Sequence, residues 1–435
     1  MFRLLIFSIF ASSVAYSQDL DIRGFYTVGV AWVESDNDPD VYKYLREYDR
    51  SANVSELTRL GLNLSAPLTD SWNFNGQLLA KQSDDDDELS ADWMFVTYQP
   101  SDMISLRLGK IKSDQWYISE YIDVGKTYLW VTPPEEVYSI FPVKSYNGAS
   151  LALEKEFGDW KIASEVSIGN FEDSRTSGFT TISQAADHLF GARVSVSYQN
   201  TDFRVAYLDL DYKNKVNGAV VAKESPKVTS AAIAGKWGSF SIIAEGVALT
   251  VPGDQDAAVI AAATSSFYTA AGELEAIATN LGTAIANEQI AMAGGDSSAI
   301  SAAVASRVAA EHLLSEAQKK LGIAAVEKEY AEAEVDGINA FHITVGNQFA
   351  EKYTPYLTYA RTSATNKSPF FSSQQSMALG FVYDINFNMD IKFEVKSIEV
   401  LDDTKGYFSK VDFTSQDALS DSTATRYAIT IDSVF

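Results

Sequence analysis

Most of the chain consists of segments in which apolar and polar side chains alternate one by one. Trp160, Ile162 and Val166 fall on one face of such a segment. Lys161 and Glu165 fall on the other face. A period of two predicts β-strands, because successive side chains of a strand point to opposite faces. The pattern predicts sixteen strands, at residues 21–33, 57–65, 72–82, 89–99, 104–112, 146–156, 160–169, 188–199, 203–211, 226–237, 240–249, 338–349, 353–362, 374–385, 388–399 and 426–435.

The connections between these predicted strands alternate between long and short. The short connections are 66–71, 100–103, 157–159, 200–202, 238–239, 350–352 and 386–387. The longer ones are 34–56, 83–88, 113–145, 170–187, 212–225, 250–337, 363–373 and 400–425. An even number of strands of about ten residues, with short turns at one end and long loops at the other, is typical of membrane barrels. We therefore predict an all-β fold, a 16-stranded antiparallel transmembrane β-barrel.

Aromatic residues cluster beside the short turns. They are Trp72, Tyr98, Phe157, Trp160, Tyr198, Phe203, Trp237, Phe240, Phe349, Tyr353 and Phe387. Strands favour aromatic residues in general, but that preference does not explain their concentration at one end. A ring of amphipathic aromatics at one depth indicates the interface between membrane and water.

The N-terminus and the composition narrow the class of protein. Residues 1–17 have the features of a signal peptide: Arg3, an apolar run over 4–11 and small residues at Ala15 and Ser17. Such a peptide predicts export, with cleavage before Gln18. The chain has no cysteine, which excludes disulfides, thiolate metal sites and covalently attached haem. Its 58 acidic and 34 basic residues argue against nucleic acid as a partner, because phosphate binding needs a basic surface.

Residues 250–337 interrupt the alternating pattern. The 85 residues from Val251 to Val335 contain 24 alanines, and alanine is the strongest helix former. We expect two helices, at about 255–293 and 297–334, separated at residues 294–296. This helical hairpin is an insertion in the sixth outer loop and should lie on the extracellular side. It would project outward, lie over an oligomer or plug the lumen, and the sequence leaves these three arrangements open.

The C-terminal strand carries a further pattern, formed by Tyr427, Ile429, Ile431 and the terminal Phe435. Together with the signal peptide, the sixteen strands and the long third outer loop at 113–145, it makes the chain resemble the Gram-negative general porins. Ser433 departs from the family's pattern, which has an aromatic residue there. The resemblance implies an outer-membrane homotrimer that contacts lipopolysaccharide and passes small hydrophilic solutes and ions. It also implies that the C-terminal pattern is the assembly signal read by the barrel assembly machinery.

In porins the third outer loop folds into the barrel and narrows the pore. Residues 113–145 carry five acidic side chains and one lysine assigned to this constriction: Asp114, Glu120, Asp123, Glu135, Glu136 and Lys126. The facing strands carry basic residues in their inward phase: Arg23, Arg59, Lys81, Arg107, Arg193 and Arg204. An acidic loop opposite a basic wall would set an electric field across the pore. Alternatively, these charges simply keep a wet lumen hydrated.

Single features of the sequence bear on other functions. Asp84, Asp85, Asp86 and Asp87 are weak candidates for binding calcium or magnesium, but a solvated loop is the better explanation of this run, and we predict neither a metal site nor a cofactor. The chain has three histidines, His188, His312 and His342, and none forms a recognisable motif with a nucleophilic residue. We therefore do not expect an enzyme. A soluble sugar-binding sandwich would not sort its loops by length. The main alternative is a surface-displayed barrel whose hairpin serves as adhesin or receptor.

Overall fold

A computed structural model describes most of the chain beyond its N-terminus. The residues described are 20–37, 42–45, 48–82, 88–140, 143–177, 180–216, 218–251, 257–332, 337–365, 372–402, 404–410, 419 and 422–435. The predicted signal peptide and the acidic run from Asp84 to Asp87 lie outside the described residues.

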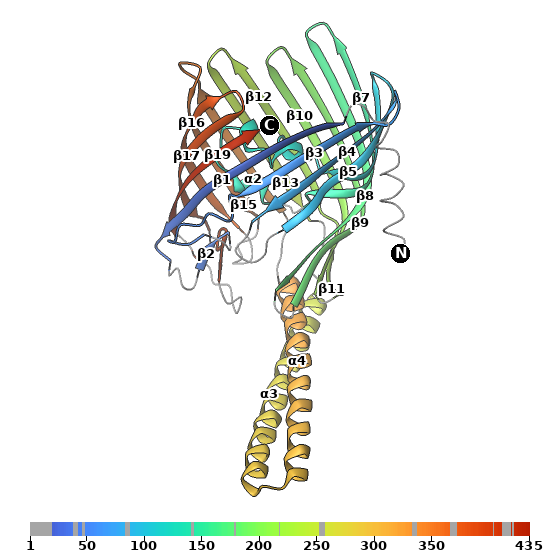
Figure 1. The fold of residues 1–435 in the computed structure, drawn as a ribbon, viewed down its shortest axis with the longest axis vertical. Coiled ribbons are helices and arrows are strands. Elements are labelled where there is room, and N and C mark those ends of the chain that lie inside the picture. Colours follow the sequence, from blue (N-terminus) through green and yellow to red (C-terminus); the bar gives the residue numbers. More distant parts are fainter. Residues whose placement is uncertain are drawn as a thin grey trace.

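In the described part of the chain, sixteen antiparallel strands form a closed wall (Figure 1). Each strand pairs with its neighbours along the chain, and β1 closes the barrel by pairing with both β3 and β19. The wall strands are β1 (Asp21–Ser35), β3 (Arg59–Pro67), β4 (Trp72–Lys81), β5 (Glu88–Ser101), β6 (Ile104–Lys112), β7 (Ser145–Phe157), β8 (Trp160–Ser177), β9 (Thr180–Tyr198), β10 (Thr201–Val216), β12 (Lys227–Trp237), β13 (Phe240–Thr250), β14 (Gly337–Asn347), β15 (Tyr353–Ala364), β16 (Gln374–Asn386), β17 (Met389–Val400) and β19 (Thr423–Val434). The predicted fold class is confirmed.

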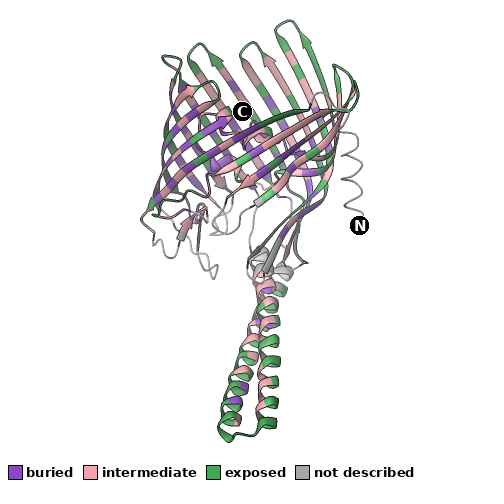
Figure 2. Ribbon diagram, in the orientation of Figure 1, coloured by how far each residue is buried: buried purple, intermediate pink, exposed green. Residues whose placement is uncertain are grey.

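Exposed and buried residues alternate along the wall strands (Figure 2). On β17, Phe393 and Val395 are 44% and 45% exposed, whereas Lys392 and Lys396 are almost fully buried. The apolar side chains therefore point outward and the charged ones point into the barrel. This is the inverse of a soluble protein, and it suits a wall between lipid and water.

The aromatic residues at the short turns form pairs on the outer surface. The Trp72 and Tyr98 rings lie 4.7 Å apart, and the Trp160 and Tyr198 rings lie 4.4 Å apart. At the same end of the barrel, the backbone N–H and carbonyl of Phe435 both bond to Gly24. The predicted C-terminal strand is therefore part of the closing pair.

Three adjacent strands are longer than predicted, and two predicted loops are wrong as a result. β8, β9 and β10 continue through much of 170–187 and 212–225, and β11 (Ala219–Glu224) pairs with the end of β10. The run from 172 to 178 contains no apolar residue, so the alternation that marks a strand is interrupted there. An ion pair of 2.8 Å between Lys215 on β10 and Glu172 on β8 reaches across β9, which lies between the two strands.

Two further short strands lie in segments predicted as loops. β2 (Tyr42–Tyr44) pairs with β18 (Phe408–Lys410), which links the first long connection to the last one. Tyr44 and Phe408 are both buried, with ring centroids 5.3 Å apart. This contact joins segments far apart in the sequence, and a local pattern cannot reveal it.

The inserted segment is a helical hairpin, as predicted, formed by α3 (Ala257–Gly294) and α4 (Ser297–Glu332). It starts at the end of the barrel that carries the long loops and extends outward from there (Figure 1). The hairpin therefore does not plug the lumen. Within the described part of the chain, no helix combines the length and hydropathy that a membrane-spanning helix needs.

The two helices of the hairpin pack as an antiparallel coiled coil. The better-buried positions recur at spacings of three and four residues, which is a heptad pattern. On α3 they are Ala270, Leu274, Ile277, Leu281, Ala284 and Glu288, and on α4 they are Ala303, Arg307, Ala310, Leu314, Ala317, Leu321 and Ala324. Glu288 and Arg307 form an ion pair of 2.6 Å between the helices.

We predict that the barrel folds without this hairpin. Replacing residues 257–332 with a short Gly-Ser linker should leave a protein whose electrophoretic mobility changes on heating, as expected of a folded barrel. The physical reason is that β13 and β14 pair along their full length, from Phe240 opposite Asn347 to Thr250 opposite Gly337. Loop length changes the closure entropy only slowly. An unfolded variant would show that the hairpin belongs to the folding core.

Candidate pore constriction

The segment between β6 and β7 folds into the barrel over residues 113–140, and we call it the inner loop. It contains two short helical turns, Ser119–Tyr121 and Gly125–Thr127, and the helix α2 (Glu135–Tyr138). Trp116, Trp130 and Val137 are almost completely buried against the inside of the wall. A loop in this position occupies space that would otherwise hold water, so it narrows the lumen.

Trp130 attaches the inner loop to the far wall. Its indole N–H donates to the hydroxyls of Thr344 on β14 and Thr358 on β15, at 2.9 and 3.0 Å. Its ring meets that of His342 edge to face, with centroids 5.3 Å apart. A buried indole needs such an acceptor, and the two threonines provide it.

Lys392 on β17 holds the loop backbone. Its ammonium group donates to the carbonyl oxygens of Gly125, Tyr128 and Trp130, at 2.5, 2.7 and 3.1 Å. It also lies 3.4 Å from the Asp432 carboxylate, which balances its charge. At Gly125 the backbone comes so close to β19 that a Cβ atom would collide with Asp432.

The α2 end of the inner loop is held by ion pairs with β17 and β19. The Glu135 carboxylate pairs with both Lys396 and Arg426. Arg426 also bonds Glu394 at 2.9 Å. Burial would raise the pKa of Glu135, but the two cations outweigh this effect and hold it at about 2. Glu136 pairs with Lys396 at 3.2 Å.

On the opposite side, the start of the inner loop faces three arginines of the wall. Arg193 lies 2.8 Å from Asp114, and Arg204 lies 3.8 Å from it. Arg107 lies 3.3 Å from Glu120. Burial raises the pKa of Asp114 to about 6: Arg193 opposes the rise, and the nearby Glu165 adds to it. Asp114 therefore titrates close to neutral pH.

Asp123, farther along the loop, is held by two lysines of β4 and β6. Its carboxylate lies 2.7 Å from Lys81 and 2.8 Å from Lys112. Burial raises its pKa, but these two lysines outweigh that effect and leave the pKa well below its usual range. Arg59 donates to the hydroxyl of Tyr128 at 2.8 Å.

The structure brings together all but one of the candidates named from sequence. The acidic loop residues contact basic wall residues, and Lys126 pairs with Asp384 at 2.5 Å. Arg23 is the exception: its side chain is 76% exposed and pairs with Asp21 near the start of β1. Alternation gives the face on which a residue lies but not its depth along the barrel.

The sequence pattern does not identify several residues of this network as members of the site. They are Lys112, Glu165, Lys392, Glu394, Lys396 and Arg426. The alternation of Lys392, Glu394 and Lys396 predicts that these β17 side chains point into the barrel. It does not predict their contacts with the inner loop, which lies more than 250 positions away in the sequence.

Some charged side chains of this network remain accessible to water. Glu120 is 38% exposed, Lys81 is 34% exposed and Arg107 is 27% exposed. These residues come from the inner loop, β4 and β6. Ions that enter the lumen would therefore meet charges of both signs at the level of the inner loop.

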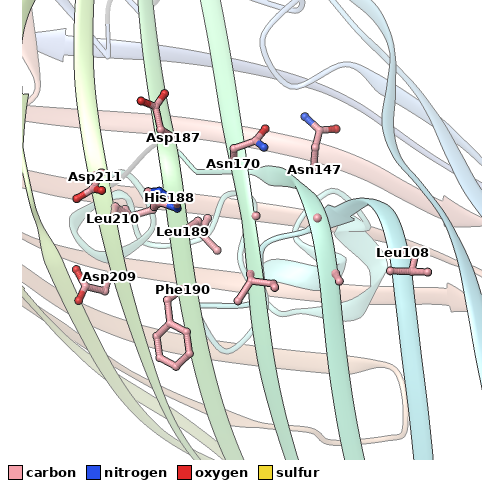
Figure 3. A pocket seen from close by; sticks show the side chains of 14 residues that line it. Leu108, Asn147, Asn170, Asp187, His188, Leu189, Phe190, Asp209, Leu210 and Asp211 are labelled. Carbon is pink, nitrogen blue, oxygen red and sulfur yellow. The ribbon is translucent and has the colours of Figure 1, made fainter.

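A hollow of about 790 Å³ lies elsewhere, on the outer surface over β6 to β10 (Figure 3). Ile168 and Phe190 line it and are among the exposed apolar residues of the wall. Asp187, His188 and Asp211 lie toward its long-loop end (Figure 3). This hollow therefore faces away from the lumen. Among the described residues, no group of three or more His, Asp or Glu side chains is placed to hold a metal ion.

Comparison with known proteins identifies the fold. No protein-family model and no curated protein matches the sequence. Solved structures do match. An anion-selective porin from Comamonas acidovorans superposes with a TM-score of 0.56 at 11% identity, over 96% of this chain and 99% of that one. The outer-membrane channel DcaP of Acinetobacter baumannii gives 0.52 at 11% identity, over 96% and 97% of the two chains.

OmpF of Salmonella typhi gives a TM-score of 0.51 at 10% identity, over 96% of this chain and 97% of that one. The similarity extends over nearly the whole chain although identity is low. The closed sixteen-stranded barrel with its outward apolar belt is therefore the fold of the Gram-negative outer-membrane porins.

Proposed function

We propose that this protein is an outer-membrane porin, a water-filled channel for passive diffusion of small hydrophilic solutes and ions. The observation that carries the proposal is the inner loop, which crosses a closed barrel and presents acidic groups to a basic wall. A barrel of sixteen strands is wide enough to leave an aqueous channel. Selectivity then depends on the charges at the narrowest level.

The proposal includes an orientation and partners. The short turns face the periplasm, and the long loops and the hairpin face the exterior, where the barrel contacts lipopolysaccharide. By its resemblance to porins, the protein is exported by its signal peptide, inserted by the barrel assembly machinery and assembled as a homotrimer. We assign it no enzymatic role: His342 is buried behind the inner loop, and His312 lies on the exposed hairpin.

The alternative function, a surface adhesin or receptor, rests on the hairpin. Its far end exposes Ile290 and Met292 to solvent, at 70% and 54%. Because the hairpin points away from the lumen, display of this end does not exclude a pore. The test is deletion of residues 257–332. If the deletion abolishes binding to a surface partner and leaves the conductance unchanged, the hairpin serves in binding and the barrel in transport.

The direct test is conductance of the purified protein in a planar bilayer. A trimeric porin should give stable steps in groups of three per insertion event. Protein that is inserted but electrically silent would contradict the proposal and favour the display function.

We predict that the exposed wall cations set the ion preference. The double substitution Lys81→Ser and Arg107→Ser should move the reversal potential in a salt gradient toward cation selectivity, because two positive charges leave the lumen. The fold should persist, since Lys112 still pairs with Asp123 and Arg193 with Glu165. The matched control is Lys319→Ser with Lys320→Ser on the hairpin, where Lys320 lies about 18 Å along α4 from the helix end nearest the barrel. This distance exceeds the Debye length of about 10 Å in 0.1 M salt. Equal shifts in both variants would contradict the assignment.

We also predict a pH-dependent selectivity. Above pH 6 Asp114 is ionised, and as the pH falls through about 6 it gains a proton and one negative charge disappears from the lumen. The reversal potential should therefore move toward anions between pH 7.5 and pH 5. Asp114→Asn should remove this step and behave at neutral pH as the wild type does at low pH. A step of the same size in Asp114→Asn would assign the titration to another group.

A further inference from the structure

A hollow of about 450 Å³ lies inside the barrel over β3 to β6, at the end that carries the short turns. Asn73, Asn75, Thr97 and Gln99 line it. Its volume is within the usual range of small-molecule sites, roughly 300–1,000 Å³. Trp72, which precedes Asn73 on β4, is exposed on the outer surface. Because side chains alternate along a strand, Asn73 and Asn75 point into the barrel.

The polar side chains of this hollow form a ladder across three strands. The amide of Asn73 donates to the hydroxyl of Ser65 at 3.1 Å, and that hydroxyl donates to Asn75 at 3.1 Å. The amide of Asn75 donates to Thr97 at 3.2 Å. We call Ser65, Asn73, Asn75 and Thr97 the amide ladder.

The amide ladder has hydrogen-bonding capacity left for a solute. An asparagine side chain offers two N–H donors and two acceptor lone pairs, and each amide uses only part of this within the ladder. All four side chains are half-buried, so the remaining donors and acceptors face the lumen. The bonds within the ladder hold the groups in fixed positions, which lowers the entropic cost of binding.

An aromatic surface adjoins the amide ladder. Phe95 lines the same hollow, and its ring stacks on Trp93 with centroids 5.3 Å apart. The guanidinium of Arg107 lies 5.6 Å from the centroid of the Phe95 ring. Aromatic rings bury large apolar areas, so they suit the apolar C–H face of a ring-shaped solute.

Asp70 and Arg107 also line the hollow, but the ladder itself carries no charge, unlike the inner loop above it. Its amides and hydroxyls both donate and accept, as do the hydroxyls of a sugar. We infer that this wall is a binding site for neutral, hydroxyl-rich solutes, with the chemistry of a small saccharide. The solute would bond the amide ladder with its hydroxyls and pack its C–H face on Phe95. This inference rests on the proposed channel function and names a solute class for it.

The test is current through the channel in a bilayer with maltotriose added. The wild type should show a saturable fall in conductance with added current noise. Polyethylene glycol of the same mass, which lacks hydroxyls along its chain, should give no saturable block. The double variant Asn73→Ala and Asn75→Ala should raise the half-blocking concentration about tenfold, the effect of losing one or two hydrogen bonds.

The matched control removes two asparagines that line the outer hollow, Asn147→Ala and Asn170→Ala, and should block like the wild type. If the ladder variant fails to fold, Thr97→Val, which keeps the side-chain shape, should also weaken the block. Absence of block in conducting wild-type channels, or equal block in the ladder variant and the wild type, would overturn this inference and leave the channel function standing. Absence of any conductance would instead contradict the channel function.

Discussion

Ion pairs between the inner loop and the barrel wall are the interaction on which this structure depends. A carboxylate enclosed in a barrel is stable only with a cation or hydrogen-bond donors beside it. The wall supplies these on two sides: Lys396 and Arg426 hold Glu135, and Lys81 and Lys112 hold Asp123. Because the loop is fixed at both places, the exposed charges of Glu120, Lys81 and Arg107 have defined positions beside it. The shape of the lumen and its electric field thus have the same cause.

Two periodicities, each confined to its own part of the chain, separate barrel from hairpin. Period two places Phe393 outward and Lys392 inward, so one strand provides both the lipid-facing belt and the attachment of the loop. The heptad pattern of 257–332 buries one stripe of each helix against the other. Neither part needs the other's surface to bury its own apolar groups. The hairpin can therefore extend from the barrel without filling the lumen.

The sequence predicts the barrel, its strand number and the hairpin, because all three follow from local periodicity. It also predicts which faces carry charge, and the structure brings Arg107 and Glu120 together accordingly. It does not predict depth, so Arg23 was assigned to a level that it does not reach. Nor does it predict the pairing of β2 with β18 or the bonds from Lys392 to the loop backbone, because these join residues hundreds of positions apart. The amide ladder was likewise hidden, since neutral residues in the inward phase give no charge signal.

The most direct test of the inner loop's position is chemical modification during single-channel recording. The chain has no cysteine, so Glu120→Cys introduces a unique thiol on the loop. If the loop lies across the lumen, a bulky charged thiol reagent should lower the conductance in discrete steps. Tyr268→Cys, at a hairpin residue that is 67% exposed, should react without changing the conductance. Complete modification of the Glu120→Cys variant with conductance unchanged would show that the inner loop does not constrict the channel.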